Sequence, residues 1–170
     1  MSLPDALAIL RMFLAIPTVW AILDGLWGLA FIFFALAALT DTIDGWLARR
    51  SGALTPHGAF LDPLADKILV LPTLVAMASV GVVDGILVAL VVAREVVVLL
   101  LRLRAYRAGR RLPASGIAKL KTICEMAGTL LLTTQGSAFA VLGTPVVIVA
   151  LLIGLYTVPR YLPMSPRRLA

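Results

Sequence analysis

Apolar segments long enough to cross a lipid bilayer recur along almost the whole chain. A transmembrane helix needs roughly 20 mainly apolar residues, and 61% of the 170 residues are hydrophobic, above the roughly half that soluble domains average. Six segments come close to this length: 6–23, 27–47, 60–82, 84–105, 117–135 and 139–160. We therefore predict an all-α fold, an integral membrane bundle of six transmembrane helices that forms one domain over residues 1–170.

The basic residues indicate how this bundle is oriented. All 15 Lys and Arg residues fit one side of the membrane, because the connections near 24–27, 82–84 and 135–139 contain none. Basic loops are cytoplasmic, so six spans place both termini in the cytoplasm of a multi-pass cell-membrane protein. The first ten residues contain Asp5 and no basic residue, which favours a retained membrane helix over a signal peptide. Anionic lipid headgroups explain the net charge of +6, and we expect no nucleic-acid partner.

Four of the nine acidic residues fall within a short stretch: Asp41, Asp44, Asp62 and Asp66. Carboxylates at membrane depth are costly and are usually paired, bound to cations or functional. On a helix, the first two lie one turn apart on one face, and so do the last two. A short connection makes the two helices antiparallel neighbours, so four carboxylates gather at their cytoplasmic ends. Mg²⁺ or Mn²⁺ suits such oxygen ligands, and two metal ions suit displacement at phosphorus.

Small residues and an arginine surround these aspartates. Gly45, Ala48 and Gly58 let a ligand approach the helix backbones, and Arg49 is placed to bind phosphate oxygens. Taken singly, Gly45 or Gly58 is more often a turn or a helix-packing residue. The whole set of aspartates is harder to explain by packing alone.

The residues from Asp41 to Asp66 carry a resemblance to a known family. The pattern Asp41-x2-Asp44-Gly45-x2-Ala48-Arg49-x8-Gly58-x3-Asp62-x3-Asp66 matches the signature of the CDP-alcohol phosphotransferases at all eight fixed positions. The resemblance implies six transmembrane helices, a homodimer and a two-metal Mg²⁺ or Mn²⁺ site open to the cytoplasm. It also implies transfer of a phosphatidyl group from CDP-diacylglycerol, with release of CMP.

The same resemblance implies residue roles. All four aspartates would hold metal, and Asp66 would also be the general base. Gly45, Ala48, Arg49 and Gly58 would shape the CDP site.

The second half of the chain bears on the acceptor alcohol. Arg94-Glu95, Arg102 and Lys119-Leu120-Lys121-Thr122 resemble the phosphatidylglycerophosphate synthases of this family, as does Leu3-Pro4-Asp5 with Arg11. Asp5 departs from a common asparagine there, and Ala118 from a common glycine. A dianionic phosphate needs several cationic donors, and Arg94, Arg102, Lys119 and Lys121 lie on the expected side. We therefore predict glycerol 3-phosphate as acceptor, although Lys119 and Lys121 also suit interfacial anchors that reach the headgroups.

Two other functions fit parts of the sequence. The same chemistry could use another acceptor, either inositol phosphate or the phosphatidylglycerol used by cardiolipin synthases. A cation transporter is a remote alternative, because transporters place their sites near the bilayer midplane between repeated, broken helices, and no repeat is evident here.

Overall fold

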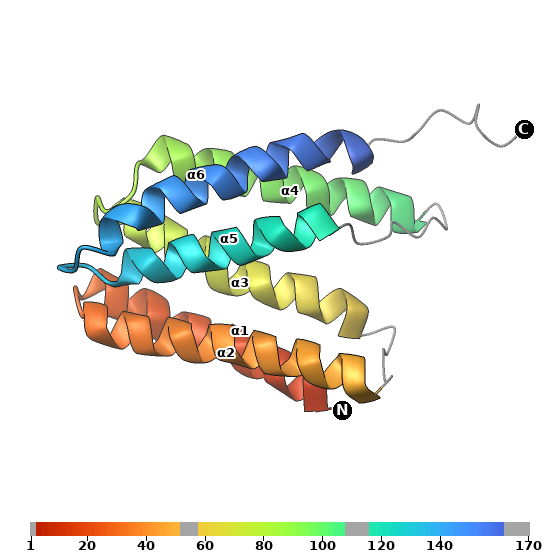
Figure 1. Ribbon diagram of the computed structural model, residues 1–170, viewed down its shortest axis with the longest axis horizontal. Coiled ribbons are helices and arrows are strands. Elements are labelled where there is room, and N and C mark those ends of the chain that lie inside the picture. The colour runs from red at the N-terminus through yellow and green to blue at the C-terminus, as the bar shows by residue number, and fades with distance from the viewer. Residues whose placement is uncertain (1–2, 52–57, 108–115, 162–170) are drawn as a thin grey trace, which may run out of the picture.

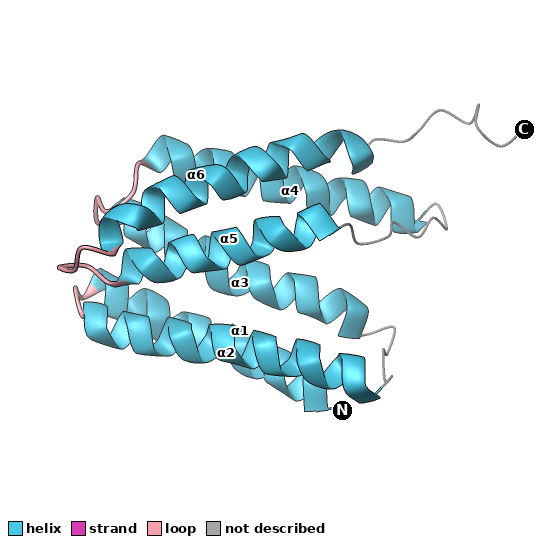
Figure 2. Cartoon of the chain, viewed as in Figure 1, coloured by secondary structure: helices cyan, strands magenta, loops and turns pink. Residues whose placement is uncertain are grey.

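The computed structural model describes residues 3–51, 58–107 and 116–161, with the side chains at 3–5, 41–51, 58–65, 105–107 and 160–161 outside the description. Within these ranges the chain is all-helical and has no strand, as Figure 2 shows. The elements are α1 (Leu3–Leu23), α2 (Trp27–Ser51), α3 (Gly58–Ser79), α4 (Gly85–Arg107), α5 (Gly116–Thr133), α6 (Ala140–Thr157) and the short 3₁₀ helix η1 (Val158–Tyr161). The described residues thus contain all six predicted helices, and the crossing of the membrane by all six stays a prediction.

Successive helices run in opposite directions, so the bundle has two distinct ends. At one end, on the right in Figure 1, α2, α4 and α6 finish and α1, α3 and α5 begin. We call this the basic end, because the connections at the opposite end, near 24–27, 82–84 and 135–139, contain no Lys or Arg. The separation of basic from non-basic connections that the sequence predicted is therefore present in the fold.

Left-handed glycines make the turns at the non-basic end. Gly25 has a φ of 71° and Gly81 a φ of 76°, a backbone conformation that side chains with a Cβ rarely adopt. The residue after each glycine donates its N–H back to the helix, from Leu26 to the Ala21 carbonyl at 2.7 Å and from Val82 to the Met77 carbonyl at 2.9 Å. These bonds satisfy carbonyls that a helix end leaves without partners, so α1 and α3 both stop sharply.

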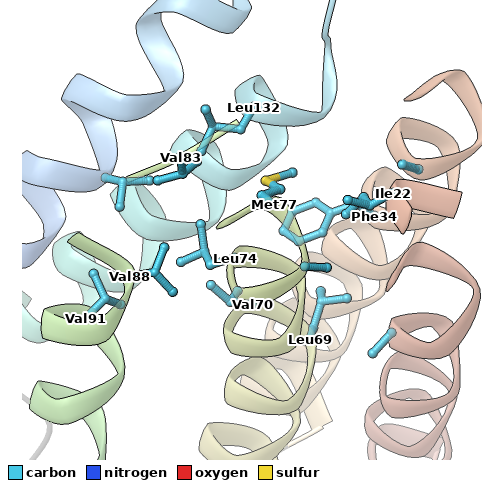
Figure 3. Packing of buried hydrophobic residues seen from close by; sticks show 14 of the residues in the cluster. Ile22, Phe34, Leu69, Val70, Leu74, Met77, Val83, Val88, Val91 and Leu132 are labelled. Atoms are coloured by element: carbon cyan, nitrogen blue, oxygen red, sulfur yellow. The ribbon is translucent and has the colours of Figure 1, made fainter. Parts of the chain in front are cut away.

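Helix α3 lies at the centre of the apolar core. Leu69, Leu74 and Met77 are fully buried, and Figure 3 shows them between Ile22 and Phe34 on one side and residues of α4 and α5 on the other. The closest helix packing is elsewhere, between α5 and α6, between α1 and α2, and between α1 and α3; α3 contacts α4 and α5 much less. The closely packed parts are therefore α1 with α2 and α3, and α5 with α6. Helix α4 packs less closely, against α3 and α6, and smaller contacts of α2 and α3 with α5 join the two parts.

Glycines allow the closest of these approaches, between α5 and α6. A Cβ on Gly128 would lie 2.8 Å from Val147 Cγ2, and a Cβ on Gly143 would lie 2.9 Å from the Gly128 carbonyl oxygen. Small residues that bring backbones together in this way are typical of helix pairs in membranes.

Many large apolar side chains lie on the outside of the molecule, while several polar and charged ones are buried inside it. On α1, Phe13 is 65% exposed and Ile16 67%, whereas Arg11 and Thr18 on the other face are fully buried. In the described residues, two helices are long and apolar enough to cross a membrane, α1 over 6–23 and α6 over 140–157. Helices α4 and α5 instead carry several charged residues within their length.

Candidate active site

The fold brings the four aspartates of the signature to the basic end. Asp41 and Asp44 lie in the last turns of α2, and Asp62 and Asp66 lie in the first turns of α3. These turns of the two antiparallel helices are at the same end of the bundle (Figure 1). The spacings of three and four residues therefore fall on helices, as predicted, and place each pair on one helical face.

Side-chain geometry is described for only one of the signature residues, Asp66. The side chains of Asp41, Asp44 and Asp62 lie outside the described residues, as do those of Ala48 and Arg49; Gly45 and Gly58 are located only through the backbones of α2 and α3. The roles predicted for all eight positions stay predictions. Among the side chains that are described, no three His, Cys, Asp or Glu residues gather into a group that could hold a metal ion.

Asp66 is held by an arginine from a distant part of the chain. Arg11 Nη1 of α1 donates to Asp66 Oδ1 at 2.5 Å, with the Arg11 side chain fully buried and that of Asp66 20% exposed. A buried arginine needs an anionic partner, and a carboxylate at this depth needs a cation. The pair satisfies both needs and fixes the Asp66 carboxylate on the side of α3 that faces α1.

A second ionic cluster includes Lys67, the residue that follows Asp66 on α3. Glu95 of α4 is 4% exposed and binds three cations: Lys121 Nζ at 2.6 Å, Lys67 Nζ at 3.3 Å, and its neighbour Arg94. Lys121 Nζ also donates to Glu125, one turn further along α5. We call these five residues, Lys67, Arg94, Glu95, Lys121 and Glu125, the Glu95 cluster. It consists of three cations and two carboxylates from three helices.

Arg94 extends this cluster to α6. Its Nη2 donates to the Gly154 carbonyl at 3.1 Å and to Thr157 Oγ1 at 2.9 Å, near the end of that helix. Carbonyls in the last turn of a helix carry partial negative charge and favour a cation. A Cβ on Gly154 would lie 2.9 Å from Arg94 Nε, so the glycine makes room for the guanidinium.

The four cations predicted to bind the acceptor phosphate are placed differently from one another. Arg94 and Lys121 are both buried and meet at Glu95. Lys119 is exposed near the start of α5, and Arg102 is half-buried near the end of α4. The phosphate-binding role stays a prediction for all four, and Arg94 and Lys121 already have protein carboxylates as partners.

Sequence reasoning did not assign a role to Lys67, Glu95 or Glu125. One signal for them is present in the chain: charged residues inside an apolar span are expected to pair, and Lys121 and Glu125 share a helical face at a spacing of four. No local pattern points to Gly154 or Thr157 as partners of Arg94, because 60 and 63 residues separate them.

The model of the CDP-alcohol phosphatidyltransferase family matches residues 1–156, which is most of the chain. The chain belongs to this family. The resemblance carried by the aspartate signature is thereby confirmed, and the match includes all of α1 to α5 and most of α6.

Similar proteins from three bacteria carry related names. A probable phosphatidylglycerophosphate synthase of Mycobacterium tuberculosis is 42% identical over 96 residues, 56% of this chain and 46% of that protein. CDP-diacylglycerol–glycerol-3-phosphate 3-phosphatidyltransferases are 34% identical in Pseudomonas fluorescens, over 82% of this chain and 75% of the relative, and 31% identical in Bacillus subtilis, over 74% and 65%. The chain thus spans about half the length of the mycobacterial relative.

Proposed function

We propose that this chain is a phospholipid-synthesis transferase that moves a phosphatidyl group from CDP-diacylglycerol to glycerol 3-phosphate. The products are CMP and phosphatidylglycerophosphate. The observation that carries the proposal is the complete aspartate signature, located on two antiparallel helices at the basic end of a chain that belongs to the CDP-alcohol phosphatidyltransferase family. The choice of acceptor is supported by the names of the relatives in Pseudomonas fluorescens and Bacillus subtilis.

The donor set fits hard divalent cations. Asp41, Asp44, Asp62 and Asp66 supply only carboxylate oxygens, which Mg²⁺ and Mn²⁺ prefer. The contact of Asp66 with the Arg11 guanidinium supports an ionised carboxylate at this place. When bound, two such ions would neutralise the carboxylates and stabilise negative charge on the diphosphate of the donor.

The remaining steps are assigned to the chain's own residues. Asp66 accepts the proton of the acceptor hydroxyl while the hydroxyl oxygen forms a bond to the lipid-linked phosphorus. The bond from that phosphorus to the CMP oxygen breaks, and CMP leaves. Arg49 binds the diphosphate oxygens and stabilises the charge that develops on them. Gly45, Ala48 and Gly58 leave room for the nucleotide beside the backbones of α2 and α3.

Phosphate recognition is assigned to the cations beyond the aspartates. Arg102 and Lys119 are less buried than Arg94 and Lys121, so they would meet the acceptor phosphate first. Arg94 and Lys121 would contribute from within the Glu95 cluster, where three cations exceed two carboxylates. An excess of positive charge favours an acceptor that carries a phosphate over a neutral alcohol.

We further propose that all six helices span the cell membrane, with both termini and the active site in the cytoplasm. Exposed apolar side chains on every one of the six helices support contact with lipid. The charges of α4 and α5 oppose spanning in isolation, but Glu95 and Glu125 pair with Arg94 and Lys121 inside the bundle, which lowers that cost. In this arrangement residues 1–170 form one domain, which the resemblance suggests works as a homodimer.

Measurement of CMP release tests the reaction and the acceptor together. The purified chain in detergent is given CDP-diacylglycerol and Mg²⁺ or Mn²⁺, with glycerol 3-phosphate, inositol phosphate or phosphatidylglycerol. We expect CMP release with glycerol 3-phosphate and formation of phosphatidylglycerophosphate. CMP release only with inositol phosphate, or only with phosphatidylglycerol, would show that glycerol 3-phosphate is not the acceptor. No CMP release with any acceptor would refute the proposed transferase activity.

A further inference from the structure

Two consecutive residues of α3 are bound to helices on different sides. Asp66 Oδ1 accepts from Arg11 of α1 at 2.5 Å, while Lys67 Nζ lies 3.3 Å from Glu95 Oε2 of α4. Neighbouring residues project about 100° apart around a helix axis. With one ionic contact on each of two faces at the same depth, α3 cannot rotate about its axis without breaking one of them.

The Glu95 carboxylate, which Lys67 contacts, is itself held in place by several other groups. It is almost fully buried and is also bound by Lys121 of α5 and by Arg94, which continues to the Gly154 carbonyl of α6. The contact from Lys67 therefore ties α3 to α4, α5 and α6 together. Carboxylates held by several charged donors keep one orientation, because every rotation loses a charge-assisted bond.

Apolar packing alone gives α3 less support on this side. Its close contacts are mostly with α1, and few are with α4 or α5. Buried apolar side chains such as Leu74, which lies beside Val88 of α4 in Figure 3, come later along α3 than Asp66 and so lie further from the basic end. At the depth of the aspartates, the Lys67–Glu95 ion pair joins α3 to α4.

We propose that Glu95 is a positioning residue, which acts through Lys67 to set the rotation of α3 and thereby the direction of the helix face on which Asp62 and Asp66 lie. The inference rests on the proposed function, because it treats these aspartates as the metal site. Glu95 and Lys67 thereby have a task distinct from binding the acceptor: they hold α3 in one rotation about its axis.

The substitution Lys67→Met tests the proposal because the two possible effects of the lysine predict opposite changes in the affinity for divalent cations. Loss of a positive charge next to Asp66 should, through Coulomb interaction alone, make divalent cations bind more tightly. Loss of positioning should make them bind more weakly, by about 10-fold or more, as for other groups that orient metal ligands. Methionine is unbranched like lysine and nearly as long, and Glu95 retains Arg94 and Lys121 as partners, so no uncompensated carboxylate is created.

Mn²⁺ binding to the purified protein without substrate is the first measurement, and Glu125→Gln is the control. Glu125 accepts from Lys121 and leaves the Lys67–Glu95 pair intact, so we expect its Mn²⁺ dissociation constant to stay within about twofold of wild type. Unchanged or tighter Mn²⁺ binding by Lys67→Met would overturn the proposal, as would an equal loss in both variants.

Hydrogen exchange in metal-free protein provides a second measurement. We expect amides in the first half of α3 to exchange faster in Lys67→Met than in wild type and in Glu125→Gln, since one of the two contacts that fix the helix is gone. If wild type binds no Mn²⁺, the metal site of the proposed function fails, and exchange alone decides: an unchanged rate in Lys67→Met refutes the positioning role. If wild type binds Mn²⁺ but releases no CMP, only the proposed reaction fails.

Discussion

Substitution of Gly143 by alanine should loosen the most closely packed pair of helices. A Cβ at this position would lie 2.5 Å from Leu132 Cγ and 2.9 Å from the carbonyl oxygen of Gly128, both well inside the 3.4 Å at which ordinary contact begins. Leu132 is itself buried at 2% exposure and has little freedom to turn away. The Gly128 carbonyl belongs to the backbone of α5, so it can retreat only if the two helices separate.

The expected cost follows from these two contacts. One added methyl group in a closely packed interior typically costs about 1–3 kcal/mol, and we expect a value in the upper half of that range because one obstacle is backbone. The helix propensity of alanine offsets at most about 1 kcal/mol of this cost. Since α5 carries Lys121 and Glu125, separation of α5 from α6 should also weaken the Glu95 cluster.

Unfolding of the detergent-solubilised protein by increasing SDS, followed by far-UV circular dichroism, measures the difference. Gly28→Ala is the matched control, because a Cβ at Gly28 meets nothing within 4 Å. We expect Gly143→Ala to unfold at a clearly lower SDS fraction than wild type. Gly28→Ala should unfold at the same SDS fraction as wild type or at a slightly higher one. Equal midpoints for Gly143→Ala and Gly28→Ala would show that α5 and α6 do not approach as closely as this geometry requires.

Three further predictions concern the active site and the Glu95 cluster. Asp66→Asn should lower the rate of CMP release at least 100-fold, the scale of general-base catalysis; near-normal turnover with intact metal binding would remove Asp66 as the base. Thr157→Val should lower the free energy of unfolding by about 0.5–1.5 kcal/mol, because the hydroxyl that accepts from Arg94 at 2.9 Å is lost; an unchanged SDS midpoint would argue against that bond. Chelation of divalent cations with EDTA should abolish CMP release, and addition of Mg²⁺ or Mn²⁺ should restore it; full activity in EDTA would contradict a metal-dependent site.

The positions of the helices could be predicted from the sequence because each is encoded locally. Apolar length marked all six, and the structure places left-handed glycines, Gly25 and Gly81, directly after two of them. The aspartate signature was likewise readable, since spacings of three and four residues have a fixed meaning on a helix. The extension of α2 to Ser51, four residues past its predicted end, reflects backbone hydrogen bonding that continues after the apolar run stops.

The partners of the buried charges could not be predicted in the same way. Arg94, Glu95, Lys121 and Glu125 stand within apolar stretches of the sequence, but their positions in the sequence do not show which groups they contact. Local spacing could suggest Lys121 with Glu125, but no spacing connects Lys121 to Glu95 across 26 residues. That contact depends on how α4 and α5 are rotated against each other.

The sequence by itself thus determined the helices, the two ends of the bundle and the family, because periodicity, charge and motif spacing are properties of neighbouring residues. The tertiary structure decided that Arg11 holds Asp66, that Glu95 gathers Lys67, Arg94 and Lys121, and that Arg94 ends on the carbonyl of Gly154. The physical reason is that a buried charge takes whichever opposite charge or carbonyl the packing of other helices brings within reach. Only the completed packing of all six helices settles that choice.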